Sequence, residues 1–177
     1  MTRGEHVLDA VLTVLAEQGI GALSVRTVAA AAGVSPAQVQ YYYRSKSDLV
    51  RAAYEYAADQ FVADLDAADA ATLHDILLLW LPLDERRERR ARVWLAYAAT
   101  AAVDPELGAE AASVDADLRT RLAEADLTAE QAAQLLALLD GVTLHCLVLP
   151  MAERQALVER TVGPFLARLT DEGRPAG

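Results

Sequence analysis

Apolar residues recur along this chain at the three- and four-residue spacing of amphipathic helices. Gly19 follows the first such segment, residues 5–18, as glycine commonly does at the C-terminal end of a helix. Alanine and leucine dominate a chain that is 54% apolar, with no long alternating run of Val, Ile and Thr that would indicate a strand. The pattern therefore predicts an all-α protein. In the first segment, the apolar face consists of Val7, Leu8, Val11, Leu12 and Leu15.

Two capping signals close together predict a helix-turn-helix. Ser24 precedes the next apolar run as its N-cap, and Gly33 ends that helix. Ser35 is the following N-cap, with Pro36 in the first helical position and Gln38 completing an S-x-x-Q capping box. A helix that ends at glycine and another that starts two residues later are joined by a short turn, which is typical of a helix-turn-helix.

The rest of the chain predicts a longer connecting helix and a bundle of five more helices. The pair Gly163-Pro164 should kink or break the last of them, because proline removes a backbone donor and clashes with the preceding turn. We therefore expect about nine helices, with a three-helix head in residues 1–47 and a larger C-terminal bundle in residues 48–177. The third helix of the head is expected at 36–43, and the later helices at about 45–66, 72–81, 85–103, 105–125, 128–149 and 152–169.

Charge is distributed unevenly between these two parts. The net charge of −10 by itself argues against a nucleic-acid partner. Residues 1–51 nevertheless carry five cations and four anions, whereas the remaining chain carries 11 cations and 22 anions. This asymmetry permits, without proving it, a head that faces DNA on a body that phosphates repel.

The sequence shows no recognisable catalytic, metal-binding or secretion motif. It has no Gly-rich phosphate loop, no G-x-S-x-G and no H-E-x-x-H. His145 and Cys146 are adjacent and point apart on a helix, and a single cysteine excludes an intrachain disulfide and suits a reducing compartment. Without a signal-peptide pattern or an apolar stretch long enough to span a bilayer, we expect a cytoplasmic protein with no membrane partner, metal or cofactor. One alternative is an enzyme with an active site that residue spacing does not reveal. The other is a helical protein-interaction module.

Two stretches of the head, SVRTVAAAAGVS at 24–35 and VQYYYRSK at 39–46, resemble the DNA-binding signature of the TetR family. The resemblance implies a homodimeric regulator, most often a repressor that binds palindromic operator DNA and is released by a small-molecule effector. A regulator without any effector remains an alternative. The body is similar, less strongly, to BetI-like members of the family in LPLD at 81–84, VWLAY at 93–97, DPEL at 104–107 and DGVTLH at 140–145.

The third helix is the candidate recognition helix, which would enter the major groove of double-stranded DNA. Gln38 and Gln40 can hydrogen-bond N6 and N7 of adenine, although the capping box competes for Gln38. The family often has Tyr-x-His-Phe at 40–43, so Gln40 replaces a tyrosine with an amide, whereas Tyr42 can still offer a hydroxyl to phosphate. Tyr43 is expected in the core, and Arg26 contacts DNA or is simply solvated. The expected DNA contacts are Ser24, Arg26, Thr27, Ser35, Pro36, Ala37, Gln38, Gln40, Tyr41, Tyr42 and Lys46.

Dimerisation is expected because two heads about one DNA turn apart bind an operator better than one. The helix predicted at 128–149 is apolar on opposite faces and therefore needs two partners, its own core and a second subunit. The alternative is that this helix is buried wholly within one monomer. The expected interface consists of Leu135, Leu138, Leu139, Val142, Cys146 and Leu149, together with Val158, Val162, Phe165 and Leu169 of the last helix.

A few polar and aromatic residues interrupt the Ala- and Leu-rich body. They either line a pocket for an unknown effector or are packed aromatics and a satisfied histidine. An arginine cluster, Arg86, Arg87, Arg89, Arg90 and Arg92, is mixed with glutamates and is expected to form a solvated helix face, with a second DNA-binding surface as the alternative. The candidate pocket residues are Trp80, Trp94, Tyr97, Asp140, Thr143 and His145.

Overall fold

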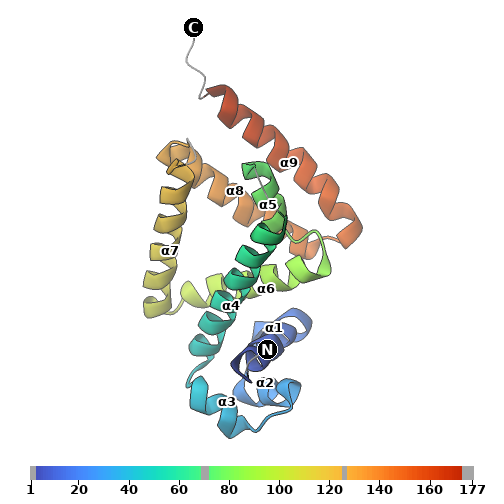
Figure 1. Cartoon of the computed structure of the whole chain (residues 1–177), viewed down its shortest axis with the longest axis vertical. Helices are drawn as coiled ribbons and strands as arrows, with labels where there is room; N and C mark the ends of the chain where they lie inside the picture. Colours follow the sequence, from blue (N-terminus) through green and yellow to red (C-terminus); the bar gives the residue numbers. More distant parts are fainter. Residues whose placement is uncertain (1–2, 69–71, 125–126, 173–177) are drawn as a thin grey trace.

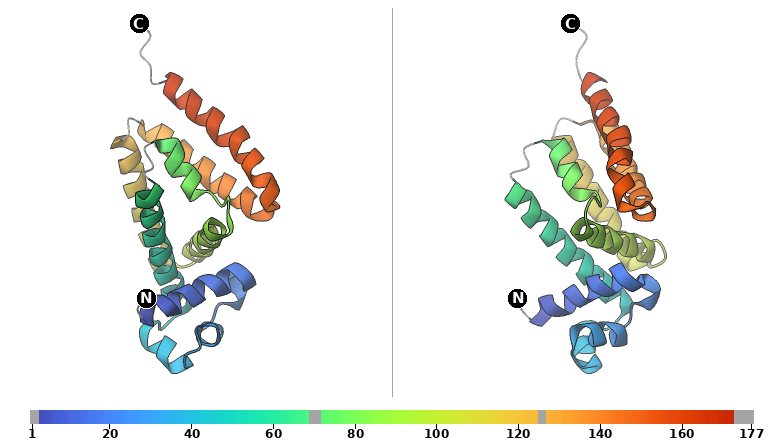
Figure 2. Two further views of the ribbon diagram at one scale, coloured as in Figure 1. Left: turned by 45° about the vertical axis from the view of Figure 1, so that its right-hand side comes forward. Right: turned by 90° about the vertical axis from the view of Figure 1, so that its right-hand side faces the viewer.

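The computed structural model describes residues 3–68, 72–124 and 127–172, and it has the predicted all-α architecture (Figure 1). Figures 1 and 2 show the head at one end of an elongated molecule, the last helix at the other end, and the connecting helix between them. In the described residues, the elements are α1 (Arg3–Gln18), the 3-10 turn η1 (Ile20–Ala22), α2 (Val25–Ala32), α3 (Pro36–Tyr42), α4 (Lys46–Ala68), α5 (Leu73–Trp80), α6 (Glu85–Ala101), α7 (Pro105–Glu124), α8 (Ala129–Val148) and α9 (Met151–Glu172).

Local capping bonds explain most of these boundaries. The Ser24 hydroxyl accepts a bond from the Thr27 amide at 3.2 Å and caps α2, which ends at Gly33 with a left-handed φ of 62°. The Ser35 hydroxyl caps α3 by accepting from the Gln38 amide at 3.2 Å. The Gln38 side chain does not close the predicted capping box, so it keeps its amide for another role.

The last helix is continuous. We expected Pro164 to kink or break it, but α9 runs through that residue without interruption (Figure 1). A proline normally pushes the preceding residue out of the helical region by clashing with its Cβ. Gly163 has no Cβ to make this clash, and α9 continues where we predicted a break.

The described part of the chain has two separate hydrophobic cores. The core at the lower end in Figure 1, called the lower core, joins the head to the base of the body. It therefore continues past residue 47, where the sequence suggested a domain boundary. Its largest fully buried members include Val7, Val11, Val14, Val28 and Val39 of the head, Leu49 and Val50 of α4, Val93 of α6 and Leu107 of α7.

The other core, called the upper core, packs α5, α8 and α9 together and corrects the predicted dimer interface. Most of the residues that we expected to meet a second subunit are instead buried inside this chain, where a partner cannot reach them. Periodicity shows that α8 has two apolar faces, but it does not reveal which one α5 and α9 cover. The corrected residues are Leu135, Leu139, Val142, Cys146, Val158, Val162 and Leu169, whereas Leu138, Leu149 and Phe165 are only partly buried.

The arginine cluster at the start of α6 is not a uniformly solvated face, which is a second correction. Arg90 is 5% exposed, forms an ion pair with Asp64 of α4 and donates to the Leu79 carbonyl at 2.6 Å. Its guanidinium also lies 5.3 Å from the ring centre of Phe61. Arg86 stays exposed but pairs with Asp64 at 2.7 Å. These arginines therefore hold α4, α5 and α6 together.

A buried ion pair also lies beside the upper core. Arg154 of α9 is 4% exposed and donates to Glu88 of α6 at 2.8 Å and to the Pro82 carbonyl at 3.0 Å. Burial of Glu88 raises its pKa, but hydrogen bonds from Arg154 and Arg92 outweigh this effect and hold the pKa below the ordinary value of 4.5. Glu88 therefore stays ionised and ties the start of α9 to α6.

Among the described helices, α8 is the one that is long and apolar enough to cross a membrane. This is weak evidence, because the core helix of a folded protein passes the same test. In this structure α8 places Leu135, Leu139 and Cys146 in the upper core.

Candidate DNA-binding surface and effector region

The recognition helix α3 is anchored by one buried side chain and presents the others outward. Val39 is fully buried against the lower core, whereas Gln40 is exposed and Gln38 is partly exposed. Ser35, Pro36 and Ala37 at the start of the helix are exposed as well. The free end of the molecule in Figure 1 therefore carries two glutamine amides that can reach the edges of base pairs.

Three consecutive tyrosines divide between the surface and the core, as expected. Tyr41 and Tyr42 are 80% and 58% exposed, and their rings meet edge to face at 5.1 Å. Tyr43 packs against the lower core, and burial raises the pKa of its phenol. The two outward hydroxyls can donate hydrogen bonds to phosphate oxygens.

The residues predicted to contact phosphate around α2 and α4 already have partners within the protein. The hydroxyl of Thr27 donates to the Ala22 carbonyl at 2.8 Å, and Ser24 caps α2. Lys46 is exposed and donates to the Ile20 carbonyl, which holds the start of α4 to η1. If these side chains contact phosphate, they must do so while keeping their bonds within the protein. Arg26, by contrast, is exposed.

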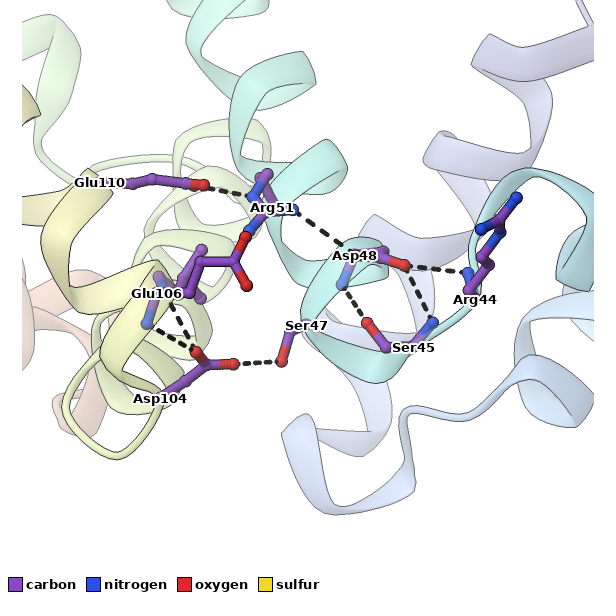
Figure 3. Close-up of polar contacts among 9 residues, drawn as sticks. Arg44, Ser45, Ser47, Asp48, Arg51, Asp104, Glu106 and Glu110 are labelled. Atoms are coloured by element: carbon purple, nitrogen blue, oxygen red, sulfur yellow. Dashed lines mark hydrogen bonds and ion pairs between the residues drawn. The ribbon is translucent and has the colours of Figure 1, made fainter.

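At the start of α4, the protein supplies its own acceptor for two backbone amides. Asp48 accepts hydrogen bonds from the amides of Arg44 and Ser45 at 3.0 and 3.1 Å, so a carboxylate of the protein already occupies this position (Figure 3). The exposed Arg44 side chain extends away from Asp48 in Figure 3. It is a candidate phosphate contact that the sequence analysis missed, although a cation directly after the recognition helix was a visible signal.

The candidate pocket residues do not all come together. Tyr97 is buried and stacks on Tyr54 of α4, with ring centres 4.0 Å apart and planes at 10°. Asp140 is accessible to solvent, yet protein atoms surround it closely enough that desolvation raises its pKa. Asp140 in turn contributes to the raised pKa of Tyr54, after burial and Tyr97, so it lies on the side of α8 that faces α4.

Thr143 shares that side of α8, one helical turn after Asp140. It is fully buried, and its hydroxyl has no hydrogen-bond partner in the described residues. His145 is exposed and lies on another face of α8, so it does not join this group. Trp94 is half-buried in α6.

Trp80 lies elsewhere, with its ring edge to face against Phe61 at 5.4 Å. Sequence reasoning missed Tyr54 and Phe61, although both are aromatic residues on the connecting helix. A separate cavity of about 170 Å³ lies between α1, α4 and α6, lined by Asp9, Leu12, Gln60, Arg86 and Arg89.

The outward face of α8 is partly apolar. Leu144 and Val148 are 44% and 75% exposed, and Ala137 and Gly141 share their face one and two turns earlier. This face does not include the residues that we expected at the dimer interface. The structure instead buries most of the expected interface stripe inside the monomer and leaves Leu144 and Val148 outward.

Two family models match this chain. Residues 7–53 match the model of bacterial regulatory proteins of the tetR family, and residues 69–171 match the C-terminal model of BetI-type transcriptional repressors. The chain belongs to the TetR family. This TetR-family protein is a DNA-binding transcriptional regulator rather than an enzyme, and the resemblance seen in the sequence is confirmed.

Individual relatives agree with this membership. The HTH-type transcriptional regulator PksA of Bacillus subtilis (strain 168) is 24% identical over 176 residues, which cover 90% of this chain and 86% of PksA. A transcriptional regulator from Rhodococcus sp. Rha1 superposes with a TM-score of 0.85 at 28% identity and 97% coverage of both chains. The multidrug binding protein EbrR in complex with ethidium has a TM-score of 0.69 at 28% identity, covering 91% of this chain and 96% of EbrR.

Proposed function

We propose that this TetR-family regulator is a cytoplasmic repressor that binds a palindromic operator as a homodimer and is released by a small-molecule effector. The observation that carries the DNA-binding part is the outward surface of α3, where Gln40, Tyr41 and Tyr42 are exposed while Val39 anchors the helix. Amides read base edges and phenols reach phosphates, so this surface combines readout and positioning in one short helix.

The proposed homodimer uses the outward face of α8 together with neighbouring α9. Leu144 and Val148 are large apolar side chains exposed on this face, and the small residues Ala137 and Gly141 beside them allow a second helix to approach closely. A two-fold interface of this kind presents the same surface from both subunits and holds two heads at a fixed separation.

The proposed effector binds in the body, on the side of α8 that faces α4. The stacked pair Tyr54 and Tyr97 offers aromatic surface, and Asp140 and Thr143 offer polar groups. EbrR, which forms a complex with ethidium, supports the expectation that a relative of this fold accepts a small organic molecule.

Release from DNA would follow from a change in the angle of α4. This helix begins directly after the head and also packs against α5 and α6 of the body. An effector that binds the body better in the off-DNA arrangement shifts the population toward it by that difference in affinity. The two heads would then no longer match major grooves one turn apart.

The experiment that tests this function selects duplexes from a random pool with the purified protein and measures their affinity by fluorescence anisotropy. We expect a palindromic consensus that the protein binds more tightly than shuffled DNA, and a complex with two protomers. A screen of small molecules by thermal shift should then find compounds that lower operator affinity. Selection without any consensus would refute DNA readout, and operator binding that no stabilising compound weakens would favour a regulator without an effector.

A further inference from the structure

A chain of polar side chains connects the start of α7 to the turn that follows the recognition helix (Figure 3). Glu110 of α7 accepts a bond from Nε of Arg51 on α4 at 2.7 Å. The Nη1 atom of Arg51 lies 3.5 Å from Oδ1 of Asp48. The other oxygen of Asp48 accepts from the amides of Arg44 and Ser45, between α3 and α4. Asp48 and Arg51 thus each have a partner on either side.

A second bond runs parallel to this chain. The hydroxyl of Ser47 donates to Oδ2 of Asp104 at 2.8 Å, which joins residues 57 positions apart in the sequence. The other oxygen of Asp104 accepts from the amides of Glu106 and Leu107 and so caps α7. Asp104 is therefore at once the N-terminal cap of α7 and an attachment point for α4.

The turn between α6 and α7 is packed tightly enough to act as a fixed base for these bonds. Leu107 is fully buried in the lower core. A Cβ added to Gly108 would come within 2.9 Å of the Ala101 carbonyl oxygen, so α7 leaves α6 at a distance that only glycine allows. A shift of this turn would therefore move Asp104 and Glu110 together.

We propose that Ser47, Asp48, Arg51, Asp104 and Glu110 form a polar relay through which the start of α7 sets the position of the α3–α4 turn and thereby of the recognition helix. The inference rests on the proposed function, since it names the residues by which the body controls the head. The relay bypasses the hydrophobic core, because every side chain in it is at least partly accessible. Glu110 acts here as a positioning residue, on the body side of the relay.

The test uses the full-length protein and the variant Glu110→Gln, with two measurements. The first follows the amide exchange rates of Arg44 and Ser45 by NMR, because those amides report directly on their bonds to Asp48. The second is affinity for the operator selected above. We expect faster exchange at both amides and operator binding weakened by about two- to fivefold, the range typical of partly exposed ion pairs. Simple electrostatics predicts the opposite sign for DNA binding, because the variant removes a negative charge.

Asp115→Asn is the matched control. Asp115 lies on the same helix, its side chain is 43% exposed like that of Glu110, and it pairs with Arg119 of α7 rather than with α4. The control makes the same charge change, and it should leave both amides and the operator affinity unchanged. A double variant of Arg51→Gln and Glu110→Gln should lose no more affinity than the worse single variant, because one broken link already interrupts the relay.

The relay is refuted if Glu110→Gln leaves the two amides unchanged, or if Asp115→Asn alters them equally. Faster amide exchange with unchanged operator affinity would also overturn it, because the turn would then not control the recognition helix. Thermal melts of both variants check that the fold is retained. Absence of a selected operator would instead refute the proposed function, while the amide measurement would still test the link from α7 to the α3–α4 turn.

Discussion

The lower core joins the head to α4, α6 and α7, whereas the upper core is confined to the body. The lower core takes Val11 and Val39 from the head, Leu49 from α4 and Leu107 from α7. The upper core packs α5 against α8 and α9, and the buried Arg154 ties α9 to α6 beside it. The DNA-binding head is thus packed onto the base of the proposed effector region, while the helices proposed to dimerise form a separate unit. Any signal from the upper part must cross α4, α6 or α7 to reach the head.

The largest expected effect concerns a fragment of residues 1–47. This fragment lacks Leu49, Val50 and Ala53, which are fully buried in the lower core together with the head. We expect it to stay unfolded in water, as judged by circular dichroism and by narrow amide dispersion in NMR. A cooperative melting transition of the isolated fragment would show that the head folds on its own. The domain boundary would then lie near residue 47, and the head would not depend on the rest of the lower core.

Removing the buried charge beside the upper core is the next largest change. Arg154→Ala removes the bonds to Glu88 and to the Pro82 carbonyl, while Glu88 keeps Arg92, and should cost about 1–3 kcal/mol of unfolding free energy in urea titrations. Arg160→Ala, at an exposed position on the same helix, should cost within about 0.5 kcal/mol. Equal losses for the two variants would mean that the buried ion pair does not stabilise this region.

The same ion pair predicts how stability depends on acidity. The pKa of Glu88 is lower in the folded protein than its ordinary value of 4.5. Its contribution to stability is therefore complete above that value and is lost as the pH falls through the lowered pKa. Glu88→Gln should flatten the acid limb of a plot of unfolding free energy against pH, and an unchanged limb would show that other carboxylates dominate it.

The proposed role of the outward face of α8 in dimerisation can be tested by substitution. Burying one valine contributes about 1.5–3 kcal/mol, so Val148→Asp should raise the dimer dissociation constant at least about tenfold in sedimentation equilibrium. Val62→Asp is the control, because Val62 is also a largely exposed valine but lies on α4. Dissociation by the control alone would move the proposed interface from α8 to α4.

Base readout by the head should be specific to one position of the operator. Gln40→Ala should cost about 1–3 kcal/mol of discrimination at a single base pair, because the amide can no longer bond the base edge. Gln155→Ala on α9 should leave the sequence preference intact, since Gln155 bonds Glu159 on its own helix. The measurement is competition anisotropy with operators that carry single substitutions, and a uniform loss at all positions would reassign Gln40 to the phosphates.

The smallest expected effect is the removal of one phosphate contact. Lys46→Ala should weaken binding to all duplexes alike and reduce the slope of log K against log salt concentration by about one. The measurement is a salt titration of operator and shuffled DNA in parallel. A loss confined to the operator would contradict a phosphate role and point to the Ile20 bond as a determinant of head geometry.

Most helix boundaries could be predicted because their causes are local. The caps at Ser24, Ser35 and Thr128 bond to amides three residues away, and Gly33 adopts a left-handed φ that glycine tolerates without strain. The outward phenols of Tyr41 and Tyr42 followed in the same way, because Val39 and Tyr43 had to face the core. These interactions lie within one or two helical turns, so neighbouring residues are sufficient to specify them.

By itself, the sequence determined the order of the helices, the helix-turn-helix and the family signature. Only the tertiary structure decided which face of α8 is covered, that Arg90 and Arg154 are buried, and that Ser47 meets Asp104. The reason is physical: a hydrogen bond to a residue four positions away is built into the helix, whereas the choice between two apolar faces depends on helices that arrive from distant parts of the chain.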